Sequence, residues 1–233
     1  MQSVKEERLV RMPSDSGDFL TVRCGDGKIL YGGAQDRFSD KRYRELGCGT
    51  ISMANMIFYL SACGRYGFFP KNNYSPSLGE FMEFADQLNR SVPPDVNGLL
   101  WMKIYKEITG DSVRYLPLFA YSKEYIFGRI INSLENDIPL MISVYDHKGY
   151  EILPCASGGV ICPGTAEHPK AHYMTLTSVF ISENCRRIIV SSWGRRYTFD
   201  FDDYFRRNRF ILLHGIGNGI GSGIFEIIRN TDV

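Results

Sequence analysis

The spacing of apolar residues in this chain changes near residue 137, and this change limits the folds that the chain can adopt. Before it, apolar positions recur at three- and four-residue intervals, which is typical of amphipathic helices. After it, short runs rich in β-branched and aromatic residues indicate strands. Helices followed by strands predict an α+β fold, in which an antiparallel sheet packs against a helical layer.

The predicted elements are bounded by glycine, proline and serine residues, which cap helices and form turns. Ser75 or Ser77 is the expected N-cap of the second helix, and Ser122 that of the fourth. The helices are predicted over residues 48–62, 75–90, 98–110 and 122–137, a β-hairpin over 19–33, and strands over 138–145, 173–181, 186–193, 196–201 and 209–216.

The chain of 233 residues is expected to form a single domain, residues 1–233. Residues 1–18 are polar, and we expect them to be loosely held. Residues 146–172 contain proline and glycine clusters without periodicity, and so long a segment within a domain is usually functional. The glycine-rich residues 215–223 lack G-x-G-x-x-G, so we expect a loop there and no dinucleotide site.

Charge and hydropathy exclude several classes of partner. The formal net charge is +1, from 27 basic and 26 acidic side chains, which gives no reason to expect nucleic acid or a membrane surface as partner. No window of 18 apolar residues predicts a membrane span, and residues 1–19 contain no apolar segment of the length expected for a signal peptide. With six cysteines and no C-x-x-C pair, the sequence favours reduced thiols and a cytoplasmic location, and it leaves the oligomeric state open.

The stretch "RELGCGTISMANMIFYL", residues 44–60, places Cys48 between two glycines at the start of a helix. Unpaired N–H groups and the dipole at a helix N-terminus favour a thiolate, the form in which cysteine is a nucleophile. The alternative is a small buried hydrophobic residue, which most free cysteines are. A phosphatase loop needs arginine six residues after the cysteine, where Ala54 stands, and a G-x-C-x-G elbow is also absent.

A cysteine nucleophile needs a base, and the chain has four histidines. His172 opens an apolar strand directly after the long aperiodic segment, so a sheet holds it rigidly at a cleft. His147 and His168 lie within that segment, and His214 lies in a later apolar strand. The set Cys155, Cys162, His168 and His172 is an alternative zinc site, but it lacks the closely spaced first pair that zinc sites usually have.

Three blocks in this order, "GCGTISMANMIFYL", "HYMTLTSV" and "IIVSSWG", resemble the signature blocks of papain-like cysteine peptidases. More narrowly, "GGAQDRFSDKRYRELGCGTISMAN" is similar to bacterial papain-like proteins related to the peptidases that process bacteriocin leaders at double-glycine sites. The resemblance covers residues 32–62 and 171–194. It implies a papain-like fold, with a helical part carrying the cysteine and an antiparallel sheet carrying the histidine.

The resemblance also implies roles for particular residues. Cys48 matches the nucleophile and His172 the base that accepts the thiol proton. Gln35 matches the side-chain donor of the oxyanion hole, where the backbone N–H of Cys48 is the second donor. Ser191 stands where the family has an asparagine or aspartate that orients the imidazole, and Trp193 would shield that contact from water. No cofactor or metal is implied.

The expected reaction is hydrolysis of a peptide or isopeptide bond through a thioester, with a peptide or protein as substrate. Serine at position 191 motivates the alternative of a catalytically silent relative that binds a peptide or glycan in the same cleft. A cysteine amidase or an acyltransferase on the same scaffold is the third possibility, and the sequence does not separate it from a peptidase.

Overall fold

A computed structural model describes residues 7–14, 19–94, 98–208 and 222–228 of the chain. Its helices are η1 (Gln35–Arg37), α1 (Lys41–Leu46), α2 (Cys48–Ala62), α3 (Leu78–Asn89), α4 (Gly98–Thr109), α5 (Lys123–Glu135), η2 (Ser157–Gly159) and α6 (Phe201–Asn208). Its strands are β1 (Arg8–Arg11), β2 (Thr21–Arg23), β3 (Ile29–Tyr31), β4 (Ser112–Pro117), β5 (Leu140–Tyr145), β6 (Leu153–Pro154), β7 (Ala171–Ile181), β8 (Arg186–Ser192), β9 (Arg195–Asp200) and β10 (Gly223–Ile228).

One large sheet organises the molecule. Its strands follow the order β4, β10, β5, β7, β8, β9, β6, and every described pair in it is antiparallel. β1 pairs with the second half of β7, beyond the residues that β5 pairs with. β2 and β3 form a separate two-stranded hairpin. The architecture is therefore α+β with an antiparallel sheet, as the sequence predicts.

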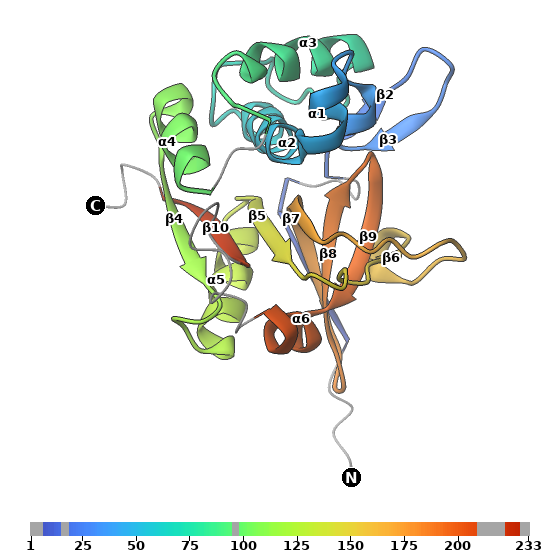
Figure 1. Ribbon diagram of the computed structural model, residues 1–233, viewed down its shortest axis with the longest axis vertical. Coiled ribbons are helices and arrows are strands. Elements are labelled where there is room, and N and C mark those ends of the chain that lie inside the picture. The colour runs from blue at the N-terminus through green and yellow to red at the C-terminus, as the bar shows by residue number, and fades with distance from the viewer. Residues whose placement is uncertain (1–6, 15–18, 95–97, 209–221, 229–233) are drawn as a thin grey trace.

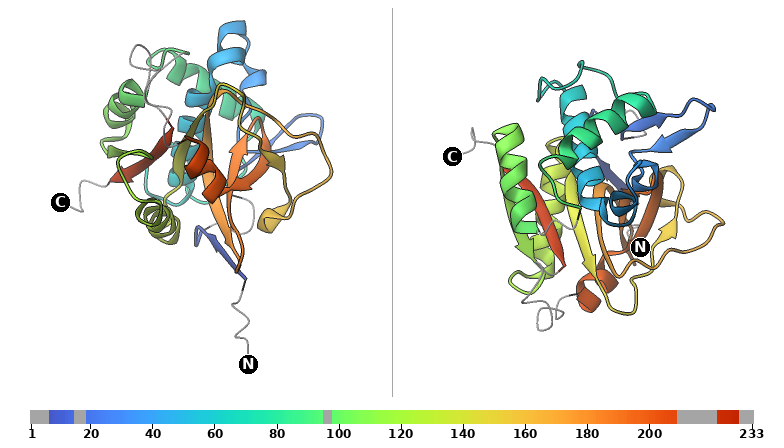
Figure 2. Two further views of the ribbon diagram at one scale, coloured as in Figure 1. Left: turned by 60° about the horizontal axis from the view of Figure 1, so that its bottom comes forward. Right: turned by 45° about the horizontal axis from the view of Figure 1, so that its top comes forward.

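The helices lie in two groups relative to this sheet. Figure 1 shows α1, α2 and α3 gathered with the β2–β3 hairpin above it, whereas α5 and α6 lie lower down beside it. The two further views in Figure 2 keep this division. α2 packs against β7, α5 against β1, β5 and β7, and α6 against β8 and β9. The first group brings the start of α2 to the end of the sheet where β7 begins.

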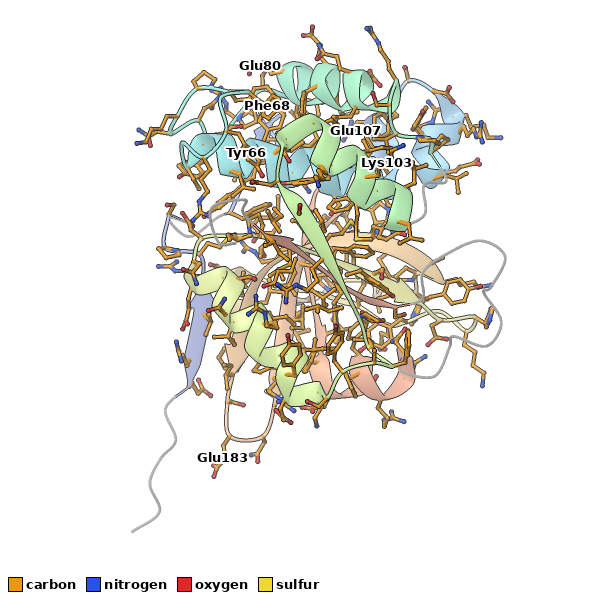
Figure 3. All side chains as sticks on the ribbon, turned by 90° about the vertical axis from the view of Figure 1, so that its left-hand side faces the viewer. Tyr66, Phe68, Glu80, Lys103, Glu107 and Glu183 are labelled. Atoms are coloured by element: carbon orange, nitrogen blue, oxygen red, sulfur yellow. The ribbon has the colours of Figure 1, made fainter. Side chains whose placement is uncertain are left out.

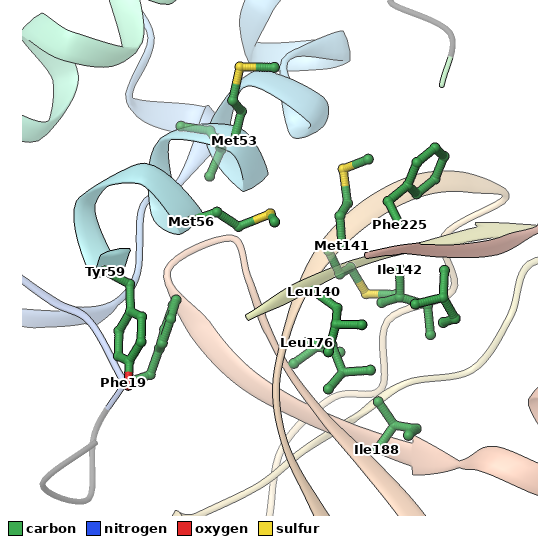
Figure 4. Close-up of a cluster of buried hydrophobic side chains, with 14 of the residues drawn as sticks. Phe19, Met53, Met56, Tyr59, Leu140, Met141, Ile142, Leu176, Ile188 and Phe225 are labelled. Atoms are coloured by element: carbon green, nitrogen blue, oxygen red, sulfur yellow. The ribbon is translucent and has the colours of Figure 1, made fainter. Parts of the chain in front are cut away.

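Helix α2 is buried on all sides and forms the centre of the core. Every residue from Gly49 to Ala62 is buried, although the sequence pattern predicts only one apolar face. Figure 4 shows Met56 of this helix directed toward the sheet residues Leu140 and Leu176. Burying a side chain of this size stabilises a fold by roughly 1.5–3 kcal/mol. Contacts with α3 on one side and β7 on the other explain why no face of the helix remains exposed.

Most elements lie where the sequence places them. The hairpin, the helices and the strands at β5, β7, β8 and β9 are confirmed within one to three residues at most ends. Ser77 and Ser122 both cap their helices through their hydroxyl groups. The strand predicted over residues 209–216, His214 and most of the glycine-rich segment lie outside the described residues.

One prediction is wrong in detail, and several elements were not predicted. Residues 8–11, expected to be loosely held, form β1, because Val10 is buried and the backbone pairs with β7. The polar segment before Cys48 contains η1 and α1, and β4 and β10 were not predicted at all. The residues after β9, for which no helix was predicted, form α6, whose apolar residues recur at helical spacing. Its first turn is held by a hydrogen bond of 2.7 Å from Asp203 N to Asp200 Oδ1.

Replacing Ser77 by alanine should lower the free energy of unfolding by about 1 kcal/mol, because it removes the hydroxyl half of a capping box. The Ser77 hydroxyl accepts a hydrogen bond from Glu80 N (3.2 Å), and Ser77 N donates one to the Glu80 carboxylate (2.7 Å). Urea denaturation measures the change. Ser91→Ala is the matched control, since this exposed serine follows the same helix and its hydroxyl has no partner among the described residues. Equal effects of the two exchanges would contradict the prediction.

Candidate active site

Cys48 is the first residue of α2, and Gly47 is all that separates this helix from α1. A Cβ on Gly47 would lie 2.4 Å from Tyr43 O and 2.8 Å from Phe38 Cε2, so only glycine fits this junction. The Gly47 carbonyl accepts the first hydrogen bond of α2, from Ile51 N (3.0 Å). The glycine is therefore needed for the packing of α1 against α2, and this packing places the half-buried thiol at the helix N-terminus.

The thiol of Cys48 lies among backbone N–H groups. Burial raises the pKa of this thiol above its usual value, and hydrogen bonds from the N–H groups of Tyr173, Gly49 and Cys48 itself oppose the shift. Two of these donors belong to the N-terminus of α2 and the third to β7. The effect of the helix N-terminus expected from the sequence is present, but burial outweighs it, so the free thiol is protonated at neutral pH.

His172 lies at the start of β7 and is held on two sides. Its Nε2 is 2.7 Å from Ser192 Oγ, and its ring stacks on Trp193 with centroids 4.2 Å apart and planes at 12°. The side chain is buried, and burial lowers the pKa of the imidazole to about 3. His172 is therefore a neutral imidazole over the physiological pH range.

The partner of the imidazole is Ser192, so the prediction that Ser191 makes this contact is wrong. Ser191 Oγ instead donates to Tyr31 O at 2.7 Å. Ser191 pairs with Thr175 across the sheet, and successive strand residues face opposite sides. His172 lies three residues before Thr175, so it shares its side of the sheet with Ser192.

A tight turn between β8 and β9 positions Trp193. Ser192 pairs with Arg195, which leaves Trp193 and Gly194 as a two-residue connection between β8 and β9. Both have positive φ, 47° and 69°, as the favoured hairpin turn requires. Such a φ is uncommon for tryptophan, and strain of this kind occurs mainly at functional sites. The turn brings the indole onto the face of the imidazole.

Gln35 lies in η1 and is buried near the thiol. Its Nε2 donates to the carbonyl groups of Arg44 (3.0 Å) and Glu45 (3.3 Å), near the end of α1. In the described arrangement these hydrogen bonds hold the end of α1, which directly precedes Cys48. Its predicted role as oxyanion donor stays a prediction, because that role requires the amide to release one of these carbonyls.

The predicted residues meet around one small cavity. It is lined by Gln35, Cys48, His172, Ser191, Ser192 and Trp193, together with Ile51, Ser52, Asn55, Tyr173, Met174 and Thr175. Its volume is about 10 Å³, which is room for a single water molecule. Among the described residues no hydrogen bond joins the thiol to the imidazole. Catalytic contacts often tighten only when substrate binds, and here a substrate must also open the cavity.

Sequence reasoning did not identify the polar groups behind the thiol. Asn55 Oδ1 accepts from Gly33 N (2.8 Å), and its Nδ2 lies 3.2 Å from Thr175 Oγ1 and 3.4 Å from Ser191 Oγ. Ser52 Oγ lies 3.1 Å from the same threonine hydroxyl. The signal was available, because Ser52 and Asn55 follow the cysteine by four and seven residues, which places polar groups on its side of a mostly apolar helix.

Neither a metal site nor a membrane helix is found in the described part of the chain. No three histidine, cysteine, aspartate or glutamate side chains gather there in a way that could hold a metal ion. The four residues considered as a zinc set therefore do not come together. None of the helices in the described ranges is long and apolar enough to cross a membrane.

Comparison with known proteins adds no assignment. No protein-family model matches this chain, and no curated protein matches its sequence. A functional interpretation therefore depends on the geometry around Cys48 and His172.

The neutral His172 should make the fold sensitive to acid. The unfolded chain accepts a proton near pH 6.5, whereas folded His172 does so only near pH 3. As the pH falls between these values, this group should lower the free energy of unfolding by up to about 1.4 kcal/mol per pH unit. Chemical denaturation between about pH 4 and pH 6 measures the slope.

His172→Gln should remove this contribution and flatten the slope. His168→Gln is the matched control, because His168 is exposed, and that variant should keep the wild-type slope. A slope that the His172 exchange leaves unchanged would show that the imidazole is not held neutral by burial.

Proposed function

We propose that this protein is a papain-like cysteine hydrolase in which Cys48 and His172 cleave a peptide or isopeptide bond through a thioester. The observation that supports this most strongly is the shared cavity of the two side chains. One is a thiol at a helix N-terminus and the other a neutral imidazole at the start of a neighbouring strand. The α+β architecture, with the cysteine on a helix that packs against the strand carrying the histidine, is consistent with the proposal.

In this mechanism the imidazole of His172 accepts the thiol proton while the sulfur attacks the carbonyl carbon of the substrate. The resulting oxyanion would accept a hydrogen bond from the backbone N–H of Cys48. The tetrahedral intermediate collapses, the C–N bond breaks, and the imidazolium gives its proton to the leaving amine. Water then attacks the thioester with the same imidazole as base, which releases the acid and restores the thiol.

The contact with Ser192 occupies one ring nitrogen of His172 and leaves the other for the thiol. The serine hydroxyl engages Nε2, so a proton on Nε2 leaves the lone pair of Nδ1 for the thiol. A hydroxyl carries no charge and stabilises an imidazolium less than a carboxylate does. The resting state is therefore a neutral thiol beside a neutral imidazole, in agreement with the raised pKa of Cys48 and the lowered pKa of His172.

A catalytically silent protein that binds a peptide is the second candidate. Two observations favour it: the cavity around Cys48 holds about 10 Å³, and the group that orients His172 is a serine. Thiol reactivity separates the candidates, because a silent relative needs no base at the cysteine.

His172→Ala should slow the alkylation of Cys48 by iodoacetamide at neutral pH at least about tenfold, because the imidazole no longer accepts the thiol proton. Tryptic digestion and mass spectrometry at several times give the rate for each cysteine. Cys63 in the same molecule is the internal control, since burial also raises the pKa of its thiol and Tyr74, not a histidine, contacts it. If His172→Ala leaves the rate at Cys48 unchanged while the fold is intact, the dyad is wrong.

The neighbouring serines provide a matched pair of variants. Ser192→Ala should slow Cys48 alkylation several-fold, because the imidazole loses the partner of Nε2. Ser191→Ala should leave that rate close to wild type and instead lower the thermal midpoint, because it removes the hydrogen bond to Tyr31 O. If Ser191→Ala slows the alkylation of Cys48 and Ser192→Ala does not, Ser191 is the residue that orients the imidazole.

A further inference from the structure

A second and larger cavity lies between α3 and the segment that follows α2. It has a volume of about 320 Å³, at the lower end of the range of small-molecule sites. Figure 3 shows Phe68 and Glu80 near each other at the top of the molecule, next to α3. The cavity is lined by three phenylalanines, two glutamates, two amides and a proline: Phe68, Phe69, Pro70, Asn73, Glu80, Glu83, Phe84 and Gln87.

One wall of the cavity is built by the aromatic residues that follow α2. Phe69 stacks on Phe58 of α2, with ring centroids 3.7 Å apart and planes at 11°. The segment is held to the end of the helix, because Asn72 N donates a hydrogen bond to Ala62 O at 2.8 Å. Phe58 lies ten residues after Cys48, which is roughly 15 Å along the helix axis. The cavity is therefore separate from the thiol.

The opposite wall is one face of α3. Glu83 and Phe84 follow Glu80 by three and four residues, so the three side chains lie on the same side of the helix. The ring of Phe84 stands nearly perpendicular to that of Phe69, with centroids 4.9 Å apart and planes at 88°. Phe68 approaches Phe84 with centroids 6.4 Å apart. Three phenyl rings in different orientations thus surround part of the cavity.

The charged groups of the lining are all negative. Glu80 and Glu83 contribute carboxylates, and no lysine, arginine or histidine of the described chain lines the cavity. Hydrogen bonds from Ser77 and, to a smaller extent, the charge of Arg23 lower the pKa of Glu80, so this carboxylate already has partners. Glu83 is exposed, and within the described residues no hydrogen bond or ion pair engages it. Glu83 therefore places an uncompensated negative charge beside the three rings.

An organic cation matches an aromatic cavity with a negative charge beside it. The face of a phenyl ring carries negative charge and attracts a cation within about 6 Å. In the described chain the arginines that lie over aromatic rings contact Tyr31, Phe127, Tyr150 and Phe201, and none of them uses the rings of this cavity. A quaternary ammonium group has no N–H donors, so it loses no hydrogen bonds of its own when it leaves water for such a site.

We propose that this cavity binds the trimethylammonium group of a small organic cation. The three phenylalanine rings contact the methyl groups, and the carboxylate of Glu83 balances the charge. The site is distinct from the Cys48 site and goes beyond the proposed hydrolase activity. A ligand bound here contacts both α3 and the segment after α2, which are otherwise joined in this region by the contacts among the rings.

Titration of the isotope-labelled full chain with choline, followed by NMR at constant ionic strength, tests the proposal. We expect saturable chemical-shift changes that fit one site. Ethanolamine has the same charge but a primary ammonium, and dimethylbutanol has the shape of choline with carbon in place of nitrogen. Both should bind at least about threefold more weakly, the first because its ammonium is more strongly hydrated and the second because it carries no charge.

Two exchanges in the cavity, each with a matched control, show whether choline binds there. Phe68→Leu should weaken binding about threefold, because leucine is apolar but has no π-face. Phe119→Leu should leave binding unchanged, and the two phenylalanines are similarly exposed, at 43% and 46%. Glu83→Gln should also weaken binding about threefold. Glu183→Gln should not, since Glu183 lies at the opposite end of the molecule (Figure 3). All four positions are exposed, so the fold should persist.

Several results would overturn the proposal. They are the absence of saturable shifts, equal affinity for choline and either analogue, and equal effects of the Phe68 and Phe119 exchanges. Retention of the protein on phosphatidylcholine vesicles, with no response to free choline, would also overturn it, because the cavity would then serve a membrane surface and not a small molecule.

Discussion

The amide of Asn55 fixes how the central helix sits against the sheet. Helix α2 is buried on all sides, and an unpaired amide in such an interior costs about 1–3 kcal/mol. Asn55 can reach its partners on β7, on β8 and at Gly33 together only in one position of the helix along the sheet. Cys48 lies seven residues earlier, which is two helical turns and the same face. The contact that fixes the helix therefore also places the thiol beside Tyr173, directly after the candidate base.

Burial sets the electrostatics of the Cys48 site. At the thiol it keeps Cys48 and His172 neutral, so proton transfer between them would create two opposite charges side by side, each stabilising the other. The buried carboxylate of Glu226 shows the other way in which this fold accommodates a buried ionisable group, because it is paired with Arg129. The neutral pair at Cys48 and His172 instead suits chemistry that begins when a substrate enters.

Local patterns predicted most of the fold. The caps at Ser77 and Ser122, the bounds of α2 and the β2–β3 hairpin depend on residues close in sequence, and all of them are confirmed. The strands that were missed are short, and their partners lie far along the chain, as β10 shows by pairing with both β4 and β5. Their backbone hydrogen bonds exist only after the sheet has assembled, so no local sequence pattern predicts these strands. Helix α6 is different, because the helical spacing of its apolar residues is visible in the sequence although no helix was predicted there.

The sequence by itself determined that a thiol begins a helix at Cys48 and that a histidine opens a strand at position 172. Both follow from local periodicity. Only the tertiary structure decided which serine meets the imidazole. That choice depends on the register between β7 and β8, because each step along a strand moves a side chain to the opposite face of the sheet. Ser191 and Ser192 are adjacent and chemically identical, so nothing but the pairing of the two strands distinguishes them.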